Sequence, residues 1–193
     1  MGLTANGGLA IPTGDFSNYY DNGYTFSAGA IYDFKFSTRL AITLGYTRWE
    51  LNQQEFNRSL EQDSVRFEGT APISTIPLLL QLKWYGTQER LKFYALIEGG
   101  FYFNSSEFSG DVFVADTLIG SISGKESSTN TGINLGLGIS FNVSENIEFD
   151  LAGKYHIVSV NNSYSFTNTN QSSTINSDQY WSLTAGISII LIE

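Results

Sequence analysis

The single histidine, His156, and a small set of charged side chains are the residues in this sequence that could do chemistry. A histidine can act as a general acid or base, whereas one histidine without any cysteine is a poor start for a metal site. The charged residues alternate with apolar ones, which gives them a shared face with His156. They are Asp33, Lys83, Lys92, Glu98, Glu148, Asp150 and Lys154. Their role depends on the elements that carry them.

The composition limits those elements to strands and turns. The 193 residues fit one domain over the whole chain, 1–193, and 15% are aromatic while only 15% are charged. Soluble domains carry about 25% charged residues. The net charge of −9 excludes a nucleic-acid partner, because phosphate binding needs clustered lysine and arginine. The absence of cysteine excludes disulfides and thiol catalysis.

No segment looks like a membrane helix or a leader sequence. The apolar runs are strand-sized, well below the roughly 20 residues of a transmembrane helix. Met1 and Gly2 lead into Leu3 without a basic segment followed by an apolar run. If the protein is exported, we therefore expect this start to be a mature or re-engineered one.

Period-two alternation is the main structural signal. Eight segments carry it, and we expect each to be a strand. The strong segments are residues 24–34, 40–47, 91–103, 133–141, 147–158 and 180–191; the weaker ones are 3–11 and part of 65–85, strongest at 76–84. Pro72 and Pro77 fall in the last of these, where a proline loses a ladder hydrogen bond, so we expect a bulge or a break near one of them.

The connections between these segments alternate in length. Short ones are expected at 35–38, 86–90 and 143–146, and long polar ones at 12–23, 52–64, 104–130 and 161–178. This order predicts an up-and-down barrel with short turns at one rim and long loops at the other. Within the longest connection, residues 111–122 alternate and are compatible with a hairpin above the membrane.

The apolar faces are expected to face lipid. Aromatic residues gather near the ends of these faces, as in the girdles of membrane barrels. They include Tyr24, Phe34, Trp84, Phe93, Phe101, Phe103, Phe141, Phe149, Tyr155 and Trp181. The opposite faces are rich in glycine, serine, threonine and asparagine and suit a narrow, filled lumen. The predicted fold class is all-β: an eight-stranded antiparallel up-and-down transmembrane β-barrel.

Several segments resemble small outer-membrane β-barrels of the kind common in Bacteroidota. The segments are 7–17, 23–29, the apolar-Pro-Leu strand 76–85, 132–141 and 186–191. The resemblance implies an OmpA/OmpX-like or porin-family barrel in a Gram-negative outer membrane. It also implies short periplasmic turns, long extracellular loops and both termini in the periplasm. Such barrels often end in an aromatic residue, whereas this chain ends in Leu191, Ile192 and Glu193, so the terminus is altered or the assembly signal differs.

The inward-facing charges predict a filled lumen. Strand direction places Asp33, Lys83, Lys92, Glu148 and Asp150 near the short turns, and Glu98 and Lys154 nearer mid-height. Because buried charges must be paired, we expect salt bridges across the lumen, with a gated ion path as the alternative. For His156 we favour a hydrogen-bonded interior residue over an acid–base role. No catalytic, cofactor-binding or metal-ligating residues are expected.

Aromatic residues in the predicted loops form a second candidate site. They are Phe16, Tyr19, Tyr20, Phe56, Phe108, Phe113, Tyr164 and Phe166. Exposed aromatics on loops often anchor partners, but they can equally pack on one another above the rim. Both interpretations stay open at this point.

The favoured function is a non-enzymatic barrel with a structural or surface-interaction role, such as an accessory subunit of a larger outer-membrane complex. Expected partners are outer-membrane lipid and proteins that bind the extracellular loops or the barrel wall. A small solute channel or porin is the alternative. A lipid-modifying enzyme would need a polar triad on the lipid-facing side, which we do not find. A soluble lipocalin usually has a Gly-x-Trp near its first strand and a late helix, and we see neither.

Overall fold

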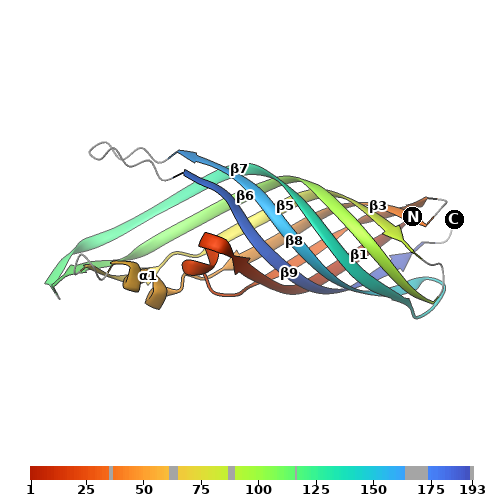
Figure 1. The fold of residues 1–193 in the computed structure, drawn as a ribbon, viewed down its shortest axis with the longest axis horizontal. Helices are drawn as coiled ribbons and strands as arrows, with labels where there is room; N and C mark the ends of the chain where they lie inside the picture. Colours follow the sequence, from red (N-terminus) through yellow and green to blue (C-terminus); the bar gives the residue numbers. More distant parts are fainter. Residues whose placement is uncertain (35–36, 61–64, 87–89, 116, 164–173, 192–193) are drawn as a thin grey trace.

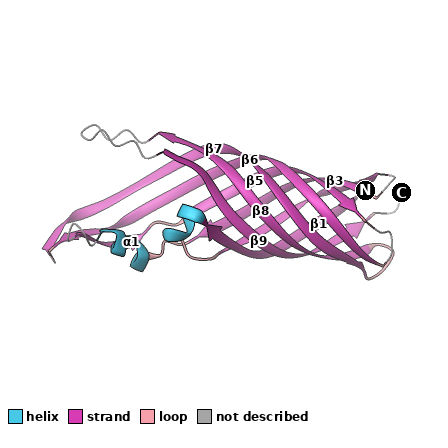
Figure 2. Cartoon of the chain, viewed as in Figure 1, coloured by secondary structure: helices cyan, strands magenta, loops and turns pink. Residues whose placement is uncertain are grey.

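The computed structural model describes residues 1–34, 37–60, 65–86, 90–115, 117–163 and 174–191. Its strands form one antiparallel sheet that closes into a barrel, and the strands are tilted relative to the barrel axis (Figures 1 and 2). The strands are β1 (Gly2–Thr13), β2 (Gly23–Phe34), β3 (Thr38–Trp49), β4 (Val65–Thr70), β5 (Ile73–Tyr85), β6 (Leu91–Val114), β7 (Thr117–Asn142), β8 (Ile147–Ser163) and β9 (Thr174–Ile190). Two short helices, η1 (Gly14–Asn18) and α1 (Gln53–Leu60), lie between strands.

Eight of these strands make the barrel, as the sequence predicts. Neighbours in sequence are neighbours in the ring, β1 pairs with β9, and the β6–β7 pairing closes the circle. The ninth strand, β4, pairs only with the outer part of β6. Both chain termini lie at the same end as the short turns, which we call the turn end; the opposite end is the loop end (Figure 1).

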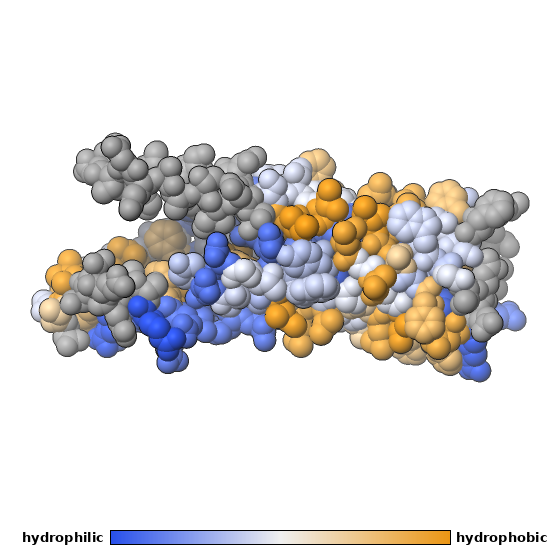
Figure 3. Space-filling view, in the orientation of Figure 1, coloured by the Kyte–Doolittle hydropathy of each residue, from blue (hydrophilic) through white to orange (hydrophobic). Residues whose placement is uncertain are grey.

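The barrel is apolar outside and polar inside. Leu137 is 71% exposed and Phe93 62%, whereas Glu98 is 1% and Arg39 4% exposed. Figure 3 shows many apolar side chains on the visible face of the barrel wall and many hydrophilic ones toward the loop end. A soluble protein would bury the first group and expose the second. This inversion, with strands long enough to cross a hydrocarbon core, is that of a transmembrane β-barrel.

The segment 104–130 is not the loop that its polarity predicts. β6 continues to Val114 and β7 begins at Thr117, and the two strands stay paired over this whole length, with a bulge at Val112/Phe113. The expected hairpin at 111–122 is therefore the tip of a much longer one. Serine, glycine and threonine in these strands predict a loop, but cross-strand pairing outweighs that weak local preference. Figure 1 shows this hairpin diverging from strands β8 and β9 beyond the rim.

The two prolines act as expected. Ala71 and Pro72 separate β4 from β5, so the predicted fourth strand is two strands. Pro77 lies inside β5, and the pairing of β3 with β5 is interrupted between Leu44–Leu78 and Thr47–Thr75. Proline has no N–H to donate there. The β5–β6 pairing continues across Pro77 unchanged.

Helix α1 lies within the predicted loop 52–64, and the sequence prediction missed it. Asn52 caps it: its Oδ1 accepts the Glu55 N–H at 3.0 Å and its carbonyl accepts the Phe56 N–H at 2.9 Å. An Asn followed three residues later by Glu is a start signal that the sequence shows. Within the described part of the chain, no helix is long and apolar enough to cross a membrane.

Candidate functional site

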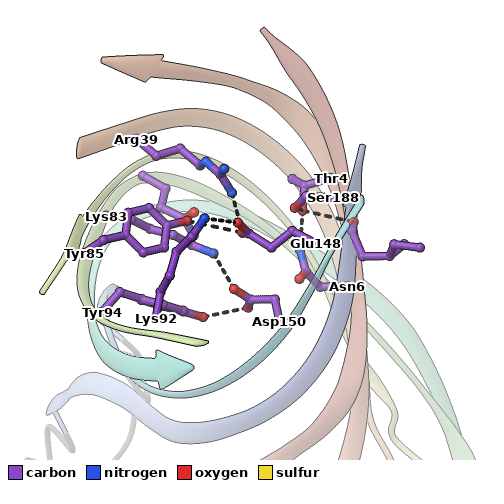
Figure 4. Close-up of polar contacts among 12 residues, drawn as sticks. Thr4, Asn6, Arg39, Lys83, Tyr85, Lys92, Tyr94, Glu148, Asp150 and Ser188 are labelled. Atoms are coloured by element: carbon purple, nitrogen blue, oxygen red, sulfur yellow. Dashed lines mark hydrogen bonds and ion pairs between the residues drawn. The ribbon is translucent and has the colours of Figure 1, made fainter. Parts of the chain in front are cut away.

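Arg39 and Glu148 form the centre of an ion-pair cluster at the turn end of the lumen (Figure 4). Arg39 Nε donates to Asp33 at 2.6 Å and its Nη1 to Glu148 at 2.7 Å. Lys92 Nζ contacts the other oxygen of Glu148 at 2.9 Å. Both Arg39 and Glu148 are almost fully buried. A depression of about 360 Å³ at the turn-end mouth is lined in part by these residues.

A second pair lies beside the first. Lys83 Nζ donates to Asp150 at 2.9 Å, and the Tyr94 hydroxyl donates to the other Asp150 oxygen at 2.6 Å. The Lys83 ammonium also sits 4.4 Å from the centre of the Tyr94 ring. Both oxygens of the buried carboxylate are thus satisfied, which a buried charge requires.

Glu98 organises the mid-height layer. It accepts hydrogen bonds from Lys154 at 2.7 Å, from Asn134 at 2.7 Å and from Gln81. Tyr102 in turn donates to Asn134 Oδ1 at 2.6 Å. Charge-assisted bonds of this kind are the stronger class of hydrogen bond.

Among the described residues, the ion-paired charges inside the barrel balance. We call the following eight residues the interior network: Asp33, Arg39, Lys83, Lys92, Glu98, Glu148, Asp150 and Lys154. It holds four cations and four anions, joined across the lumen. The sequence prediction named all except Arg39. The alternation assigns Ala41 and Thr43 to the inward face of their strand. Position 39 lies two residues before Ala41 on the same face, so the same rule would have identified Arg39 as an interior residue.

His156 lies inside the barrel toward the loop end. Its ring stacks on Tyr180 with centroids 4.1 Å apart, and its Nε2 lies 2.8 Å from Ser182 Oγ. Nδ1 meets no partner among the described residues. The free space beside this pair is about 30 Å³, enough for a water molecule rather than a substrate. A histidine–serine pair therefore exists, but it is sealed inside the barrel.

An aromatic cap closes the lumen above His156. Trp49 meets Tyr180 edge-on at 4.9 Å, and its indole N–H donates to the Ala10 carbonyl at 3.2 Å. Phe16 from η1 packs on Trp49 at 5.2 Å and on Tyr20 at 4.9 Å. The structure therefore gives two of the candidate loop aromatics, Phe16 and Tyr20, a place in this cap.

The other loop aromatics also pack on the protein. Tyr19 contacts Phe56, and Phe56 contacts Phe67. Phe113 lies under the Arg66 guanidinium. A side chain at Gly124 would collide with the ring of Phe108, which lies across that glycine. Tyr164 and Phe166 fall outside the described residues. The described members thus pack within the loop-end structure.

Beyond the rim, three strands form what we call the protruding sheet: β4, β6 from Asn104 to Val114 and β7 from Thr117 to Asn130. Its tip exposes Val114, Leu118, Ile119 and Ile122. One of its edges, along β4, is covered by α1. Asn57 Oδ1 accepts the Phe67 N–H at 2.8 Å, and Asn57 Nδ2 donates to the Phe67 carbonyl at 2.9 Å.

The loop end carries most of the acidic excess. Its described residues include nine acids and four bases. The acids are Asp15, Asp21, Glu50, Glu55, Glu68, Glu107, Asp111, Glu126 and Asp178; the bases are Arg48, Arg58, Arg66 and Lys125. Each base is already paired with one of these acids. In the protruding sheet, the bond from Lys125 lowers the pKa of Glu107.

Comparison with known proteins identifies the fold. No protein-family model matches the sequence, and no curated protein matches it. Neisserial surface protein A, from Neisseria, is similar in structure, with a TM-score of 0.57 and 18% identity over 98% of this chain and 96% of that one. A major outer membrane protein from Thermus thermophilus has a TM-score of 0.52 and 10% identity over 97% and 98% of the two chains. The likeness is one of fold: that of small outer-membrane β-barrels.

Proposed function

We propose that this small outer-membrane-type β-barrel is a non-enzymatic surface-interaction protein, with the barrel as the membrane anchor of the protruding sheet. The observation that carries this proposal is the pairing of β6 and β7 far beyond the rim, with β4 added to their side. A barrel needs only short connections to close. A rigid sheet held clear of the membrane offers a large surface for a partner.

The proposal places the protein in the outer membrane of a Gram-negative cell, with the short turns in the periplasm and the protruding sheet outside. The apolar outer wall and the fold support this location. The closer resemblance to Bacteroidota barrels stays a prediction from the sequence.

The filled lumen supports the anchor role over a channel role. The interior network crosses the lumen at two levels, and the aromatic cap closes it above. Eight strands leave an interior just wide enough for side chains. The non-enzymatic part of the proposal draws support from the sealed position of His156 and Ser182.

The test removes the protruding sheet. Residues 104–130 are replaced by a short turn that joins Phe103 to Thr131, and the variant and the parent are displayed on Gram-negative cells. Proteins that co-purify with each in mild detergent, and the adhesion of the cells, are compared. We expect the associations of the parent to be lost while the barrel keeps its heat-modifiable mobility on gels. A variant with Ala115→Gly, in the turn at the tip of an intact sheet, is the folded control. Retention of every association without the sheet contradicts the proposal, as does a parent that associates with nothing.

A further inference from the structure

The protruding sheet has two edges, and they differ. The β4 edge is blocked at Phe67, where Asn57 of α1 pairs with both backbone groups as a neighbouring strand would. Gln53 Nε2 adds a further bond to the Phe67 carbonyl at 3.0 Å. Covering an edge strand in this way prevents another chain from pairing with it. The β7 edge differs: among the described residues, its last partner on the side away from β6 is Ser159, opposite Thr131.

The direction of the β7 backbone follows from its hydrogen bonds. The Asn142 N–H donates to Arg90 beside β6, and the Val143 N–H donates to Ile147 at the start of β8. In an antiparallel pair the bonding direction alternates with every residue. Even-numbered residues of β7 therefore bond to β6, and odd-numbered residues point their N–H and C=O groups the other way. From Ser121 to Thr129 the register is regular, so five odd residues point these groups away from β6.

The shape of this edge suits the approach of another strand. The side chains of the five odd residues are Ser121, Ser123, Lys125, Ser127 and Thr129, and four of them are small. Lysine is a usual means of protecting an edge, but Lys125 is held by Glu107 of β6. Gly124, between Ser123 and Lys125, has no side chain of its own, and the Phe108 ring lies over it. The apolar Ile119 and Ile122 stand exposed next to the edge and would meet apolar side chains of an added strand.

We propose that the β7 edge from Ser121 to Thr129 binds an extended, basic segment of a partner protein as an added strand. The inference rests on the proposed surface-interaction function and names the kind of partner. About nine partner residues would pair along this length. Main-chain hydrogen bonds would hold the segment, and its alternate side chains would select it.

The charge of the loop end argues for a basic segment. The described residues of the loop end include nine acids and four bases, and each base is already paired with one of the acids. A basic segment would be drawn to this field and an acidic one repelled. A second copy in the same membrane fits less well. Two copies in one membrane are related by rotation about the membrane normal, so both β7 strands would run toward the membrane and lie parallel. A symmetric pair formed by one strand and its copy is antiparallel instead.

The test uses proline to remove one edge-facing N–H. In Ser123→Pro the lost N–H is one that points away from β6, so the β6–β7 hairpin should remain. Ser123→Thr is the matched control, because it keeps that N–H and a strand-forming residue. The probes are two synthetic peptides of about twelve residues. Both have an alternating valine–threonine sequence. In one peptide some of the threonines are replaced by lysine, and in the other the same threonines are replaced by glutamate. Binding to the barrel in lipid nanodiscs and amide exchange by NMR are measured.

The expected result has three parts. The lysine peptide binds the parent and the Ser123→Thr variant. Ser123→Pro weakens binding by about tenfold or more. The peptide slows exchange at Ser121, Ser123, Lys125 and Ser127, whose amides exchange fast without it. Equal binding of the two peptides, unchanged exchange at these amides, or equal affinity of the proline and threonine variants overturns the proposal. Self-association through β7 in place of peptide binding also overturns it. If removal of 104–130 abolishes cell adhesion but Ser123→Pro does not, the proposed function stands and the edge proposal fails.

Discussion

Glu148 shows how the barrel interior is held together residue by residue. One carboxylate oxygen accepts Arg39 and the other Lys92, while the Tyr85 hydroxyl lies 3.4 Å from the first. Each of these groups was taken out of water when the barrel closed. Such a cluster adds little net stability compared with apolar packing, but loss of one member leaves an uncompensated charge.

We therefore expect Glu148→Gln to destabilise the barrel by about 3–5 kcal/mol. The measurement is urea unfolding of the protein in detergent micelles or lipid vesicles. Glu107→Gln removes an acid that also pairs with a lysine, but on the exposed protruding sheet. Its loss should change stability far less than the loss of Glu148, because the Glu107–Lys125 pair is exposed to solvent. Equal losses for the two variants would refute the view that the interior network is buried and coupled.

Ala115 is the second residue with a clear consequence. It lies in the turn between β6 and β7 with φ of +47°, a left-handed conformation that a side chain disfavours. Ala115→Gly should relieve about 1 kcal/mol of this strain. The measurement is amide hydrogen exchange. We expect slower exchange in the strands next to the tip and no change in the barrel strands. Faster exchange near the tip would contradict this account.

At the scale of elements, α1 is small but well placed. It is one short helix, capped by Asn52 and attached to β4 through the side chains of Asn57 and Gln53. Phe56 of the helix also packs against Phe67 at 5.7 Å. These contacts give β4 a partner on the side that β6 does not occupy.

Asn57→Ala should open the β4 edge without unfolding the sheet. The Phe67 N–H would lose its acceptor, so its exchange with solvent should accelerate while the β6–β7 amides keep their rates. Asn57→Asp is the comparison variant: it keeps the acceptor for the N–H and loses the donor to the carbonyl. If the alanine and aspartate variants protect Phe67 equally well, the side chain of Asn57 does not protect the edge.

At the scale of the whole molecule, charge and polarity divide the protein into three zones. The barrel wall is apolar, the interior network is neutral in sum, and the acidic excess lies mainly at the loop end. The first zone fits lipid and the second fills the lumen. The third zone is the one that carries the recognition proposed above.

A filled lumen predicts that the reconstituted barrel does not conduct steadily. In planar bilayers we expect no stable open level on the nanosiemens scale, because side chains of the interior network and of the aromatic cap lie across the lumen in the described part of the barrel. A protein preparation checked for folding by gel mobility is the required control. A steady open level in that preparation would restore the channel alternative.

Much of the architecture could be predicted from the sequence. Period-two alternation located all eight barrel strands, and alternating loop lengths gave the up-and-down order. The parity of each strand assigned Lys83, Glu98 and His156 to the interior. The partners of these residues could not be predicted, because Lys83 pairs with Asp150 and Lys154 with Glu98 through the stagger of strands around the ring. Alternation along a strand tells whether a side chain points into the lumen. It does not tell which residues of the other strands lie at the same height in the barrel.

The sequence by itself determined the membrane barrel, since a face that must meet lipid constrains every second residue of a strand. Beyond the rim that constraint ends. There the polar strands of 104–130 look like a loop, and only tertiary pairing makes them a sheet. The same pairing decides that Asn57 covers one edge and that β7 leaves the other without a described partner. Edges are formed by neighbours rather than by the strand itself, so the surface proposed to bind partners is visible only in the folded protein.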